Sequence, residues 1–157
     1  MLEAGEKNKA LVRRFEEAQT KGDLDTIREL LAPDFVDHRL FPGYEDAGCE
    51  GYIQFVADVH AAFSDVRYVI EDQIAAEGDR VVSRLISSGV HDRGEFMGLA
   101  PTGKEFKMTA IVTHRIEGSK IVEEWTEASD VAALTQARLE QERIERERVE
   151  QELLGPV

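Results

Sequence analysis

The chain has a single cysteine and no long apolar run, and each of these shortages excludes a class of structure. Cys49 is the single cysteine among 157 residues, so an intramolecular disulfide and a metal site built from several cysteines are excluded. Nowhere do about 18 apolar residues follow one another, and the sequence therefore predicts no helix that spans a membrane. Residues 1–18 are charged and periodic without an apolar centre, unlike a secretory signal, so we expect a cytoplasmic location.

Positive charge is also scarce. The chain carries 19 Lys and Arg against 32 Asp and Glu, which makes a formal net charge of −13. A nucleic-acid backbone or an anionic membrane surface requires a basic face on its partner, so this balance argues against both. The stretch 138–152 holds six Glu and four Arg, a net charge of only −2, so the acidity belongs to the whole chain.

Several motifs that would carry chemistry are absent. The sequence contains no phosphate-binding glycine loop, no dinucleotide fingerprint and no nucleophile elbow. The four histidines, His38, His60, His91 and His114, form no HxH or HxxxH pair, so we expect no metal and no cofactor. The length and the 42% hydrophobic content are typical of one globular domain.

The spacing of apolar residues predicts three helices in the first part of the chain. They span residues 8–21, 24–31 and 52–63, with a short extended piece at 34–38. Val12 and Phe15 belong to an apolar stripe of the first helix. Asp23 can cap the second helix, and Pro33 ends it.

After the third helix the hydrophobic period changes from that of a helix to that of a strand. The predicted strands span residues 66–70, 81–91, 105–116 and 121–129. Gly78 and Asp79 supply a hairpin turn between the first two strands. Helices followed by strands in hairpin order predict an α+β fold, in which the helices lie against one face of a curved antiparallel sheet.

From Asp130 onward the residues are strong helix formers, which predicts a long charged C-terminal helix. Its apolar residues Leu134, Leu139, Ile144 and Val149 fall five apart. Five residues advance about 500° around a helix, so these side chains form no stripe and a heptad coiled coil is disfavoured. Two interpretations stay open: a docked first turn followed by a solvated helix that reaches a partner subunit, or a fraying tail.

Several segments together resemble a known family. They are residues 8–15, 22–25, 30–38, 63–65, 94–104 and 118–125, in the family's order and spacing. They resemble the SnoaL-like polyketide cyclases, or ester cyclases, of the nuclear transport factor 2-like superfamily. The resemblance covers residues 7–137, so we expect a domain over 1–137 and a charged helical extension over 138–157.

The resemblance implies a more specific architecture than the hydrophobic pattern does. The family's sheet is a cone, an α+β barrel, which is closed by helices and encloses an apolar cavity. Its members are usually homodimers that pair through the outer face of the sheet. The implied partners of this chain are therefore a small apolar molecule and a second copy of itself.

His114 lies on a face of its predicted strand that is otherwise apolar, shared with Phe106, Met108, Val112 and Ile116. If that face lines the cavity, the imidazole points into a dry pocket as a proton carrier or hydrogen-bond donor. A two-residue turn at 118–119 would place Glu123 opposite His114, with Trp125 diagonal to it. A structural His–Glu pair is therefore the alternative.

The resemblance also implies a catalytic acid. In the family's polyketide cyclases, an aspartate just beyond the tryptophan-bearing strand is the general acid and base of an intramolecular aldol closure. By its position after Trp125, that role falls to Asp130. The sequence departs from the family's pattern here, since Thr126 replaces the first acid and one extra residue precedes Asp130. Glu127 is the substitute acid if it faces inward with Trp125. The alternative for Asp130 is an N-cap of the following helix.

Five more residues are predicted to contact a ligand: His38, His91, Phe96, Met97 and Trp125. His38 would lie at the cavity rim, and His91 with Phe96 and Met97 would form an adaptable apolar mouth. Trp125 would line the pocket or pack beneath it. The alternatives are a surface contact for His38 and plain core packing for Phe96 and Met97.

Two functions are compatible with these residues. The first is a cofactor-free enzyme that cyclises or isomerises a small apolar carbonyl compound. Asp130 or Glu127 would then carry the proton, and His114 would hold the enolate oxygen. The second is a module that binds an apolar ligand, or dimerises, without catalysis. The replacement at Thr126 and the charged terminal helix favour the second function.

Overall fold

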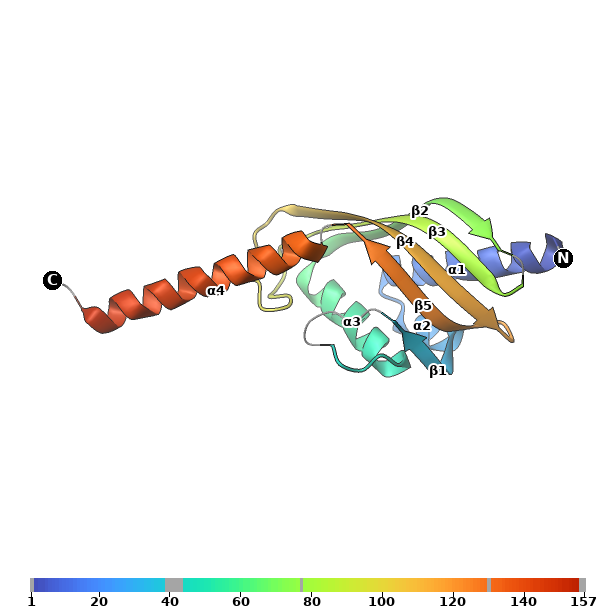
Figure 1. The fold of residues 1–157 in the computed structure, drawn as a ribbon, viewed down its shortest axis with the longest axis horizontal. Coiled ribbons are helices and arrows are strands. Elements are labelled where there is room, and N and C mark those ends of the chain that lie inside the picture. The colour runs from blue at the N-terminus through green and yellow to red at the C-terminus, as the bar shows by residue number, and fades with distance from the viewer. Residues whose placement is uncertain (1, 39–43, 77, 130, 156–157) are drawn as a thin grey trace.

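The computed structural model describes residues 2–38, 44–76, 78–129 and 131–155, with the side chains of 2 and 131–138 left out. The helices in these ranges are α1 (Leu2–Lys21), α2 (Leu24–Leu30), α3 (Cys49–Ala62) and α4 (Val131–Leu154). The strands are β1 (Leu31–Asp37), β2 (Ser64–Ala75), β3 (Arg80–Val90), β4 (Glu105–Glu117) and β5 (Lys120–Ala128). Their order along the chain confirms the predicted α+β class (Figure 1).

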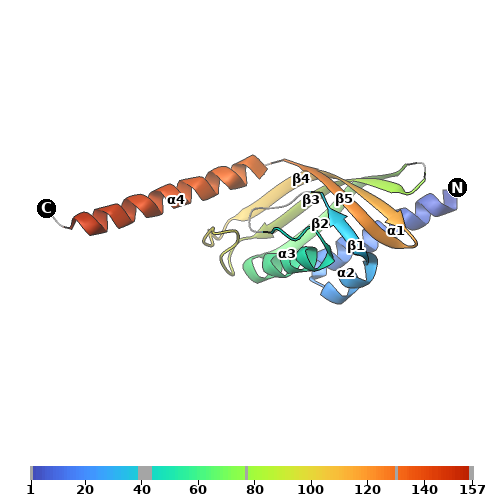
Figure 2. The same cartoon turned by 60° about the horizontal axis from the view of Figure 1, so that its bottom comes forward.

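The strands form one curved sheet that does not close, in the order β1-β5-β4-β3-β2. Antiparallel ladders join β2 to β3, β3 to β4 and β4 to β5. The four predicted strands are thus antiparallel as expected, and the extended piece predicted at 34–38 belongs to a fifth strand, β1, which pairs with β5 in parallel. A parallel pair needs a long crossover connection, and the chain between β1 and β5 contains α3 and three strands. Figure 2 shows α1, α2 and α3 together on one side of the sheet.

The predicted start of α2 is confirmed at Asp23. Its carboxylate accepts hydrogen bonds from the backbone N–H of Thr26 at 3.2 Å and from the Thr26 hydroxyl at 2.6 Å. Gly22, between the two helices, has a φ of +68°, a conformation that glycine adopts without strain. This sharp turn folds α2 back against α1.

The core lies between the helices and the inner face of the sheet, with Phe15 of α1 near its centre. The Phe15 ring is fully buried, and its centroid lies 5.6 Å from the rings of both Tyr52 and His114. Ile27 and Ile121, which are also fully buried, belong to the same cluster. The apolar stripe predicted for the first helix thus packs against α3 and β4 together.

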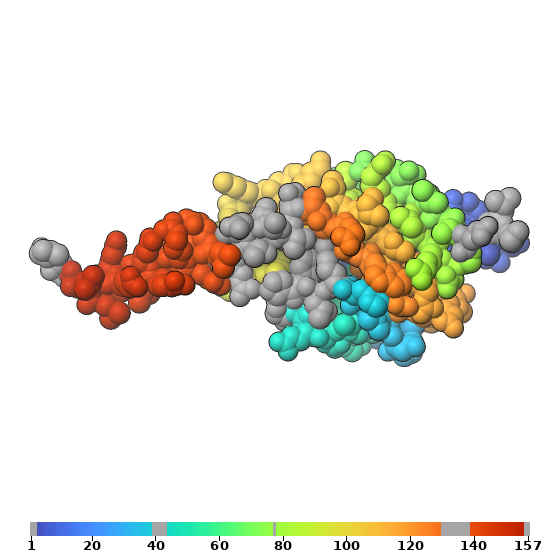
Figure 3. Space-filling model, viewed as in Figure 1, coloured from blue at the N-terminus to red at the C-terminus, as the bar shows by residue number. Residues whose placement is uncertain are grey.

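Helix α4 extends away from the rest of the molecule (Figures 1 and 3). Its side chains Leu139, Ile144 and Val149 are exposed, as their five-residue spacing predicts. Ion pairs one turn apart, such as Arg143 with Glu147 at 2.6 Å, run along its surface. None of the described helices is long and apolar enough to cross a membrane.

Replacing Phe15 with alanine should lower the free energy of unfolding by about 3–5 kcal/mol, because it opens a cavity in the core. Urea denaturation measures the change. Val69→Ala, at a half-exposed position on β2, is the control and should stay within about 0.5 kcal/mol of the parent. Equal losses in the two variants would contradict this account of the core.

Candidate functional site

A cavity of about 110 Å³ lies between the helices and the inner face of the sheet. Most of its wall is apolar, and Phe55, Val59, Phe63, Leu85, Phe96 and Met108 contribute to it. A set of ionisable and amide side chains interrupts this wall: Glu16, Gln19, Asp37, Tyr52 and Glu124, here called the polar cluster. An apolar wall with a few convergent polar groups is the usual form of a small-molecule site.

Strand alternation explains which residues reach the cavity. On β4, Phe106, Met108 and Ala110 line it, while the intervening Lys107 and Thr109 are exposed on the outer face. The same alternation places Leu85 and Ser87 of β3 in the wall. The period-two pattern therefore predicts the sheet side of the cavity directly.

The helix side of the polar cluster is a chain of hydrogen bonds. The Tyr52 hydroxyl of α3 donates to Gln19 Oε1 at 2.9 Å, and Gln19 Nε2 donates to Glu16 Oε2 at 2.6 Å. Both Glu16 and Gln19 come from α1, and Glu16 is only 2% exposed. A glutamate is almost never buried to this extent without a partner or a change of protonation.

On the sheet side, His114 Nε2 donates to Glu124 Oε2 at 2.8 Å. His114 is 0% exposed and lies behind the cavity wall, whereas Glu124 is part of the wall. The Thr126 hydroxyl approaches the other Glu124 oxygen at 3.4 Å. Asp37 of β1 lies on the neighbouring strand, directly beside Glu124 in the ladder.

The His–Glu pair forms, but with a different glutamate from the predicted Glu123. In the ladder Ile116 pairs with Ile121, whereas Arg115 pairs with Glu123, so Val122 is an extra residue on β5. This β-bulge shifts every later residue of β5 by one position. Glu124 therefore lies opposite His114 and faces inward, and Glu123 faces outward.

Burial and neighbouring charges change the protonation of the buried acid and base. Burial raises the pKa of Glu16 to about 8, and the charge of Glu124 adds to the rise, against the effect of His114 and Gln19. Burial alone would lower the pKa of His114. The hydrogen bond to Glu124 and the charge of Glu124 are the largest of the effects that oppose burial, and the pKa of His114 is raised. Glu16 thus keeps its proton to a higher pH than an ordinary carboxyl group, beside the hydrogen-bonded pair of His114 and Glu124.

Two of the three residues predicted to be catalytic, His114 and Glu127, lie in different places. His114 reaches the cavity only through Glu124. Glu127 is exposed on the outer face. The prediction that it faces inward assumed a regular strand, and the bulge at Val122 turns the residues after it to the opposite face. Asp130 lies outside the described residues, so its placement stays a prediction.

The predicted mouth residues lie together at the apolar side of the cavity. Phe96 lines it, and Met97, with a φ of +52°, packs against the cluster that Phe96 forms with Phe63. His91 is buried behind this cluster, stacked on Phe63 with ring centroids 4.7 Å apart, and its Nε2 contacts the carbonyl oxygen of Gly94 at 2.7 Å. Of these three, Phe96 has direct access to a ligand.

His38 and Trp125 lie on the outer face of the sheet instead of in the pocket. Their rings stack with centroids 4.7 Å apart and planes 6° from parallel, and the Arg80 guanidinium lies 5.0 Å from the Trp125 ring. The bulge is again the reason, since Trp125 follows Glu124 and takes the opposite face. The prediction that Trp125 lines the pocket is therefore wrong.

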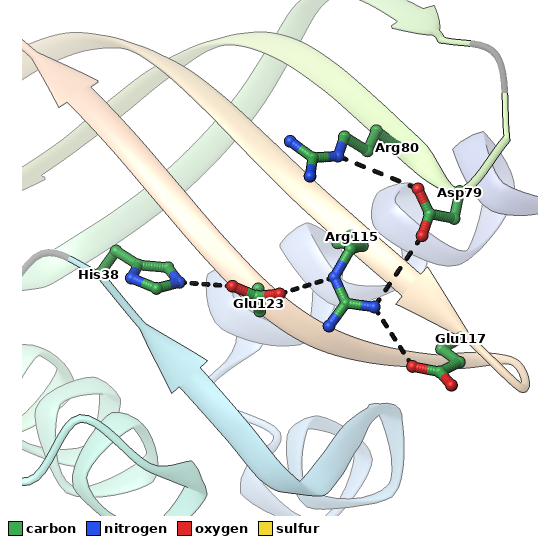
Figure 4. Close-up of polar contacts among 6 residues, drawn as sticks. All are labelled: His38, Asp79, Arg80, Arg115, Glu117 and Glu123. Atoms are coloured by element: carbon green, nitrogen blue, oxygen red, sulfur yellow. Dashed lines mark hydrogen bonds and ion pairs between the residues drawn. The ribbon is translucent and has the colours of Figure 1, made fainter.

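The His38 imidazole also ends a network of charges across the outer face (Figure 4). Its Nε2 contacts Glu123 Oε2 at 2.6 Å, and Arg115 Nε donates to Glu123 Oε1 at 2.6 Å. Arg115 also lies 3.2 Å from Glu117 and 3.9 Å from Asp79. The network ties β1, β5, β4 and the turn before β3 together on the side away from the cavity.

Sequence reasoning missed most of the polar cluster. Glu16 and Gln19 are three residues apart on α1, beside the apolar stripe of Val12 and Phe15, and this spacing was the available signal. The inward direction of Glu124 was not predicted, because the bulge that causes it leaves no mark in the hydrophobic pattern. Among the described residues, no group of three or more His, Cys, Asp or Glu side chains is arranged to hold a metal ion.

The raised pKa of Glu16 predicts a pH-dependent stability. Between the ordinary carboxyl pKa of 4.5 and about 8, the unfolded chain loses this proton while the folded chain keeps it. The free energy of unfolding should therefore fall as the pH rises through this window, by an amount on the order of a few kcal/mol. The pKa of His114 is also raised in the folded chain, so its contribution to the free energy of unfolding is likewise lost as the pH rises.

The variant Glu16→Gln tests this prediction. Its free energy of unfolding, measured by urea denaturation across that pH window, should fall less steeply with rising pH than that of the parent. Glu17→Gln is the matched control, because Glu17 is exposed and paired with Lys21 on the helix surface. An unchanged pH dependence in the Glu16→Gln variant would show that Glu16 is ionised in the folded chain.

Comparison with known proteins agrees with the fold. Residues 9–150 match the family model of SnoaL-like polyketide cyclases. Aklanonic acid methyl ester cyclase AcmA of Streptomyces galilaeus is 32% identical over 110 residues, which cover 69% of this chain and 76% of AcmA.

Solved structures give the same result. IdmH of Streptomyces antibioticus, a candidate polyketide cyclase, superposes with a TM-score of 0.68 at 35% identity, covering 82% of this chain and 96% of IdmH. TsrD of Streptomyces laurentii superposes with a TM-score of 0.71 at 23% identity, covering 84% of this chain and 94% of TsrD, which shows the shared fold. The chain belongs to the family of SnoaL-like polyketide cyclases.

Proposed function

We propose that the protein is a cyclase that binds a small apolar carbonyl compound in the cavity and cyclises or isomerises it by acid–base chemistry without a cofactor. The family supports a cyclase-type function. The observation that carries the finer proposal is the polar cluster, which places three carboxyl groups, those of Glu16, Asp37 and Glu124, in a mostly apolar wall. Carboxyl groups in such surroundings are suited to proton transfer near neutral pH.

Glu124 is the group that we assign as proton acceptor. Its carboxylate takes a proton from the carbon next to a ligand carbonyl, and an enolate forms. The enolate carbon then bonds to a second carbonyl carbon of the same molecule, whose π electrons become an alkoxide. The alkoxide takes the proton back from Glu124, so the protein returns to its starting state.

His114 positions this base rather than touching the ligand. Its Nε2 holds Glu124 Oε2 at 2.8 Å, and its Nδ1 has no hydrogen-bond partner among the described residues. The raised pKa of His114 favours the imidazolium form, which balances the carboxylate charge inside the protein. This contact fixes the direction of the Glu124 carboxyl group at the cavity wall.

The apolar wall supplies the rest of the chemistry. Phe55, Phe63 and Phe96 form edge-to-face contacts, with ring centroids 5.3–6.0 Å apart, on one side of the cavity. Such a surface excludes water, which strengthens electrostatic interactions and protects a reactive enolate. It would also hold a flexible apolar chain in the bent shape that ring closure requires.

Two assays test the proposal. Aklanonic acid methyl ester, the compound in AcmA's name, is the trial substrate for ring closure, followed by chromatography and mass spectrometry. The simpler ketone 2-acetylnaphthalene in D2O reports proton abstraction alone, because deuterium enters its methyl group and is visible by NMR. We expect enzyme-dependent exchange, and binding of the ketone without exchange would contradict the catalytic proposal.

Glu124→Gln should lower the exchange rate by about 10²- to 10⁴-fold, because it removes the base but keeps the side chain's size. Glu123→Gln is the matched control: the adjacent carboxylate faces the outer surface, where it contacts His38 and Arg115. An equal rate in the Glu124→Gln variant and the parent would overturn the assignment of the base.

The acids that the sequence predicted remain alternatives to Glu124 and are tested in the same assay. Glu127→Gln and Asp130→Asn should retain the exchange activity if Glu124 is the base. A loss confined to either of these variants would transfer the role to that residue and would imply that β5 or the following segment rearranges when a ligand binds.

A ligand-binding module without catalysis is the second candidate function. Two observations favour it: Thr126 occupies the position of the family's first acid and lines the cavity, and Glu124 already has a partner in His114. Saturable binding of 2-acetylnaphthalene with no deuterium incorporation at any pH would support this function over the enzyme.

We also propose that two copies pair through the outer face of the sheet. Apolar side chains lie there across β2 to β5: Val69, Ile74, Val82, Ile86, Ile111 and Trp125. The ladder brings Val69 opposite Ile86 and Ile74 opposite Val82, so they form a continuous surface. Ile111 in the middle of this face is 45% exposed in the single chain.

Ile111→Lys should convert a dimer to a monomer, because it places a charge in the centre of the contact. Sedimentation velocity at micromolar concentration measures the outcome. Ile144→Lys on α4 is the control that separates pairing through the sheet from pairing through the helix. A monomeric parent chain would contradict the proposal outright.

A further inference from the structure

We infer that Glu16 is a second acid of the cavity, held in its protonated form, which donates a hydrogen bond to the carbonyl oxygen of the ligand. The inference rests on the proposed function and deepens it, because it states what the ligand must present to the polar cluster. It assigns contact with the substrate to a residue of α1. The proposed base is formed by Glu124 and His114, and Glu16 and Gln19 of α1 are not part of it.

The hydrogen bonds around Glu16 determine which of its oxygens carries the proton. The Tyr52 hydroxyl donates to Gln19 Oε1, which fixes the direction of the Gln19 amide. Gln19 Nε2 must then point at Glu16, where it donates to Oε2 at 2.6 Å. Because Oε2 is the acceptor, the proton of the neutral acid belongs on Oε1.

The surroundings of Glu16 favour the neutral acid. The side chain is 2% exposed, and its α1 neighbours Val12 and Phe15 are fully buried apolar residues. The charge of His114, which is paired with Glu124, lowers the pKa of Glu16, but burial outweighs this effect. A buried carboxyl group next to a carboxylate keeps its proton well above the ordinary range, and the pKa of about 8 agrees with this.

The ionisable groups that face Glu16 come from each element packed around it. Glu124 of β5 and His114 of β4 act on it through their charges, Tyr52 of α3 is linked to it through Gln19, and Asp37 of β1 and Tyr68 of β2 line the same cavity. The charge of Glu124 raises the pKa of Glu16, whereas that of His114 lowers it, and burial is the largest cause of the rise. A ligand carboxylate would be disfavoured in the same place, because it would be buried beside Glu124.

A protonated carboxyl group at this position complements an enolate. The Glu16 O–H donates to the ligand's carbonyl oxygen while Glu124 removes the neighbouring carbon-bound proton. As negative charge moves onto that oxygen, the hydrogen bond strengthens, which stabilises the transition state more than the ground state. The Glu16 proton stays on Glu16 in the complete cycle, so the balance of the reaction is unchanged.

The ligand class follows from this arrangement. The cavity should take an apolar molecule whose ketone oxygen reaches Glu16, and it should prefer that ketone to a hydrocarbon of the same shape. The pair of 2-acetylnaphthalene and 2-isopropenylnaphthalene provides this comparison, because a C=CH₂ group replaces the C=O group. Binding is measured with the full-length protein by calorimetry or fluorescence, so the result is independent of turnover.

At pH values well below 8, the ketone should bind roughly 3- to 10-fold more tightly than the hydrocarbon, the ratio expected for one net hydrogen bond. The preference should disappear above that pKa, where Glu16 loses its proton. The C=O stretching band of the bound ketone should shift to lower frequency only in the lower pH range.

Glu16→Gln separates this role from a structural one. The glutamine keeps a neutral donor and cannot titrate, so the ketone preference should persist but become independent of pH. Glu17→Gln, on the exposed side of the same helix, should retain the parent's pH dependence. A parent preference that does not change with pH, or that is identically pH-dependent in Glu16→Gln, would overturn the inference.

The outcomes also distinguish this inference from the proposed function. Equal binding of ketone and hydrocarbon at every pH, together with deuterium exchange, would overturn the role of Glu16 and leave the function intact. Failure of both naphthalenes to bind would overturn both proposals.

Discussion

The hydrogen-bonded pair of His114 and Glu124 is the interaction on which the interior of this protein depends. It joins β4 to β5 beneath the cavity and keeps one negative charge stable in an apolar wall. Removing one member of such a pair leaves a buried unpaired charge and typically costs about 3–5 kcal/mol. The direction of Glu124 and the packing of Phe15 against the imidazole both follow from its presence.

Helix α1 links this pair to the stability of the whole fold. Phe15 supplies the centre of the core, and the adjacent Glu16 supplies an acid to the cavity. A leucine at position 16 would satisfy the apolar surroundings better, so the buried carboxyl group lowers stability in return for chemistry. Natural proteins commonly accept this kind of loss at their functional sites.

The spacing of apolar residues predicted most of the helices and strands. In a two-layer fold each element buries one face, so its apolar residues repeat with the period of a helix or of a strand. Phe15 and Val12 marked the buried side of α1, and the alternation from Phe106 to Val112 marked the cavity side of β4. Two features had no local signal. The parallel pairing of β1 depends on where β5 joins the sheet, and the bulge at Val122 leaves no mark in the hydrophobic pattern. A likeness to a family locates a cavity, but it does not say which acids line it.

The bulge at Val122 has a consequence for how this cavity could change. The strand after it carries two alternating sets of side chains: Glu124, Thr126 and Ala128, or Glu123, Trp125 and Glu127. The extra residue decides which set is inside, so β5 encodes two different pocket linings in one sequence. A one-residue slip of β5 that removed the bulge but kept every residue would exchange the wall that carries Glu124 and Thr126 for one that carries Glu123, Trp125 and Glu127. Such a slip would alter the lining of the cavity more sharply than any one substitution inside it.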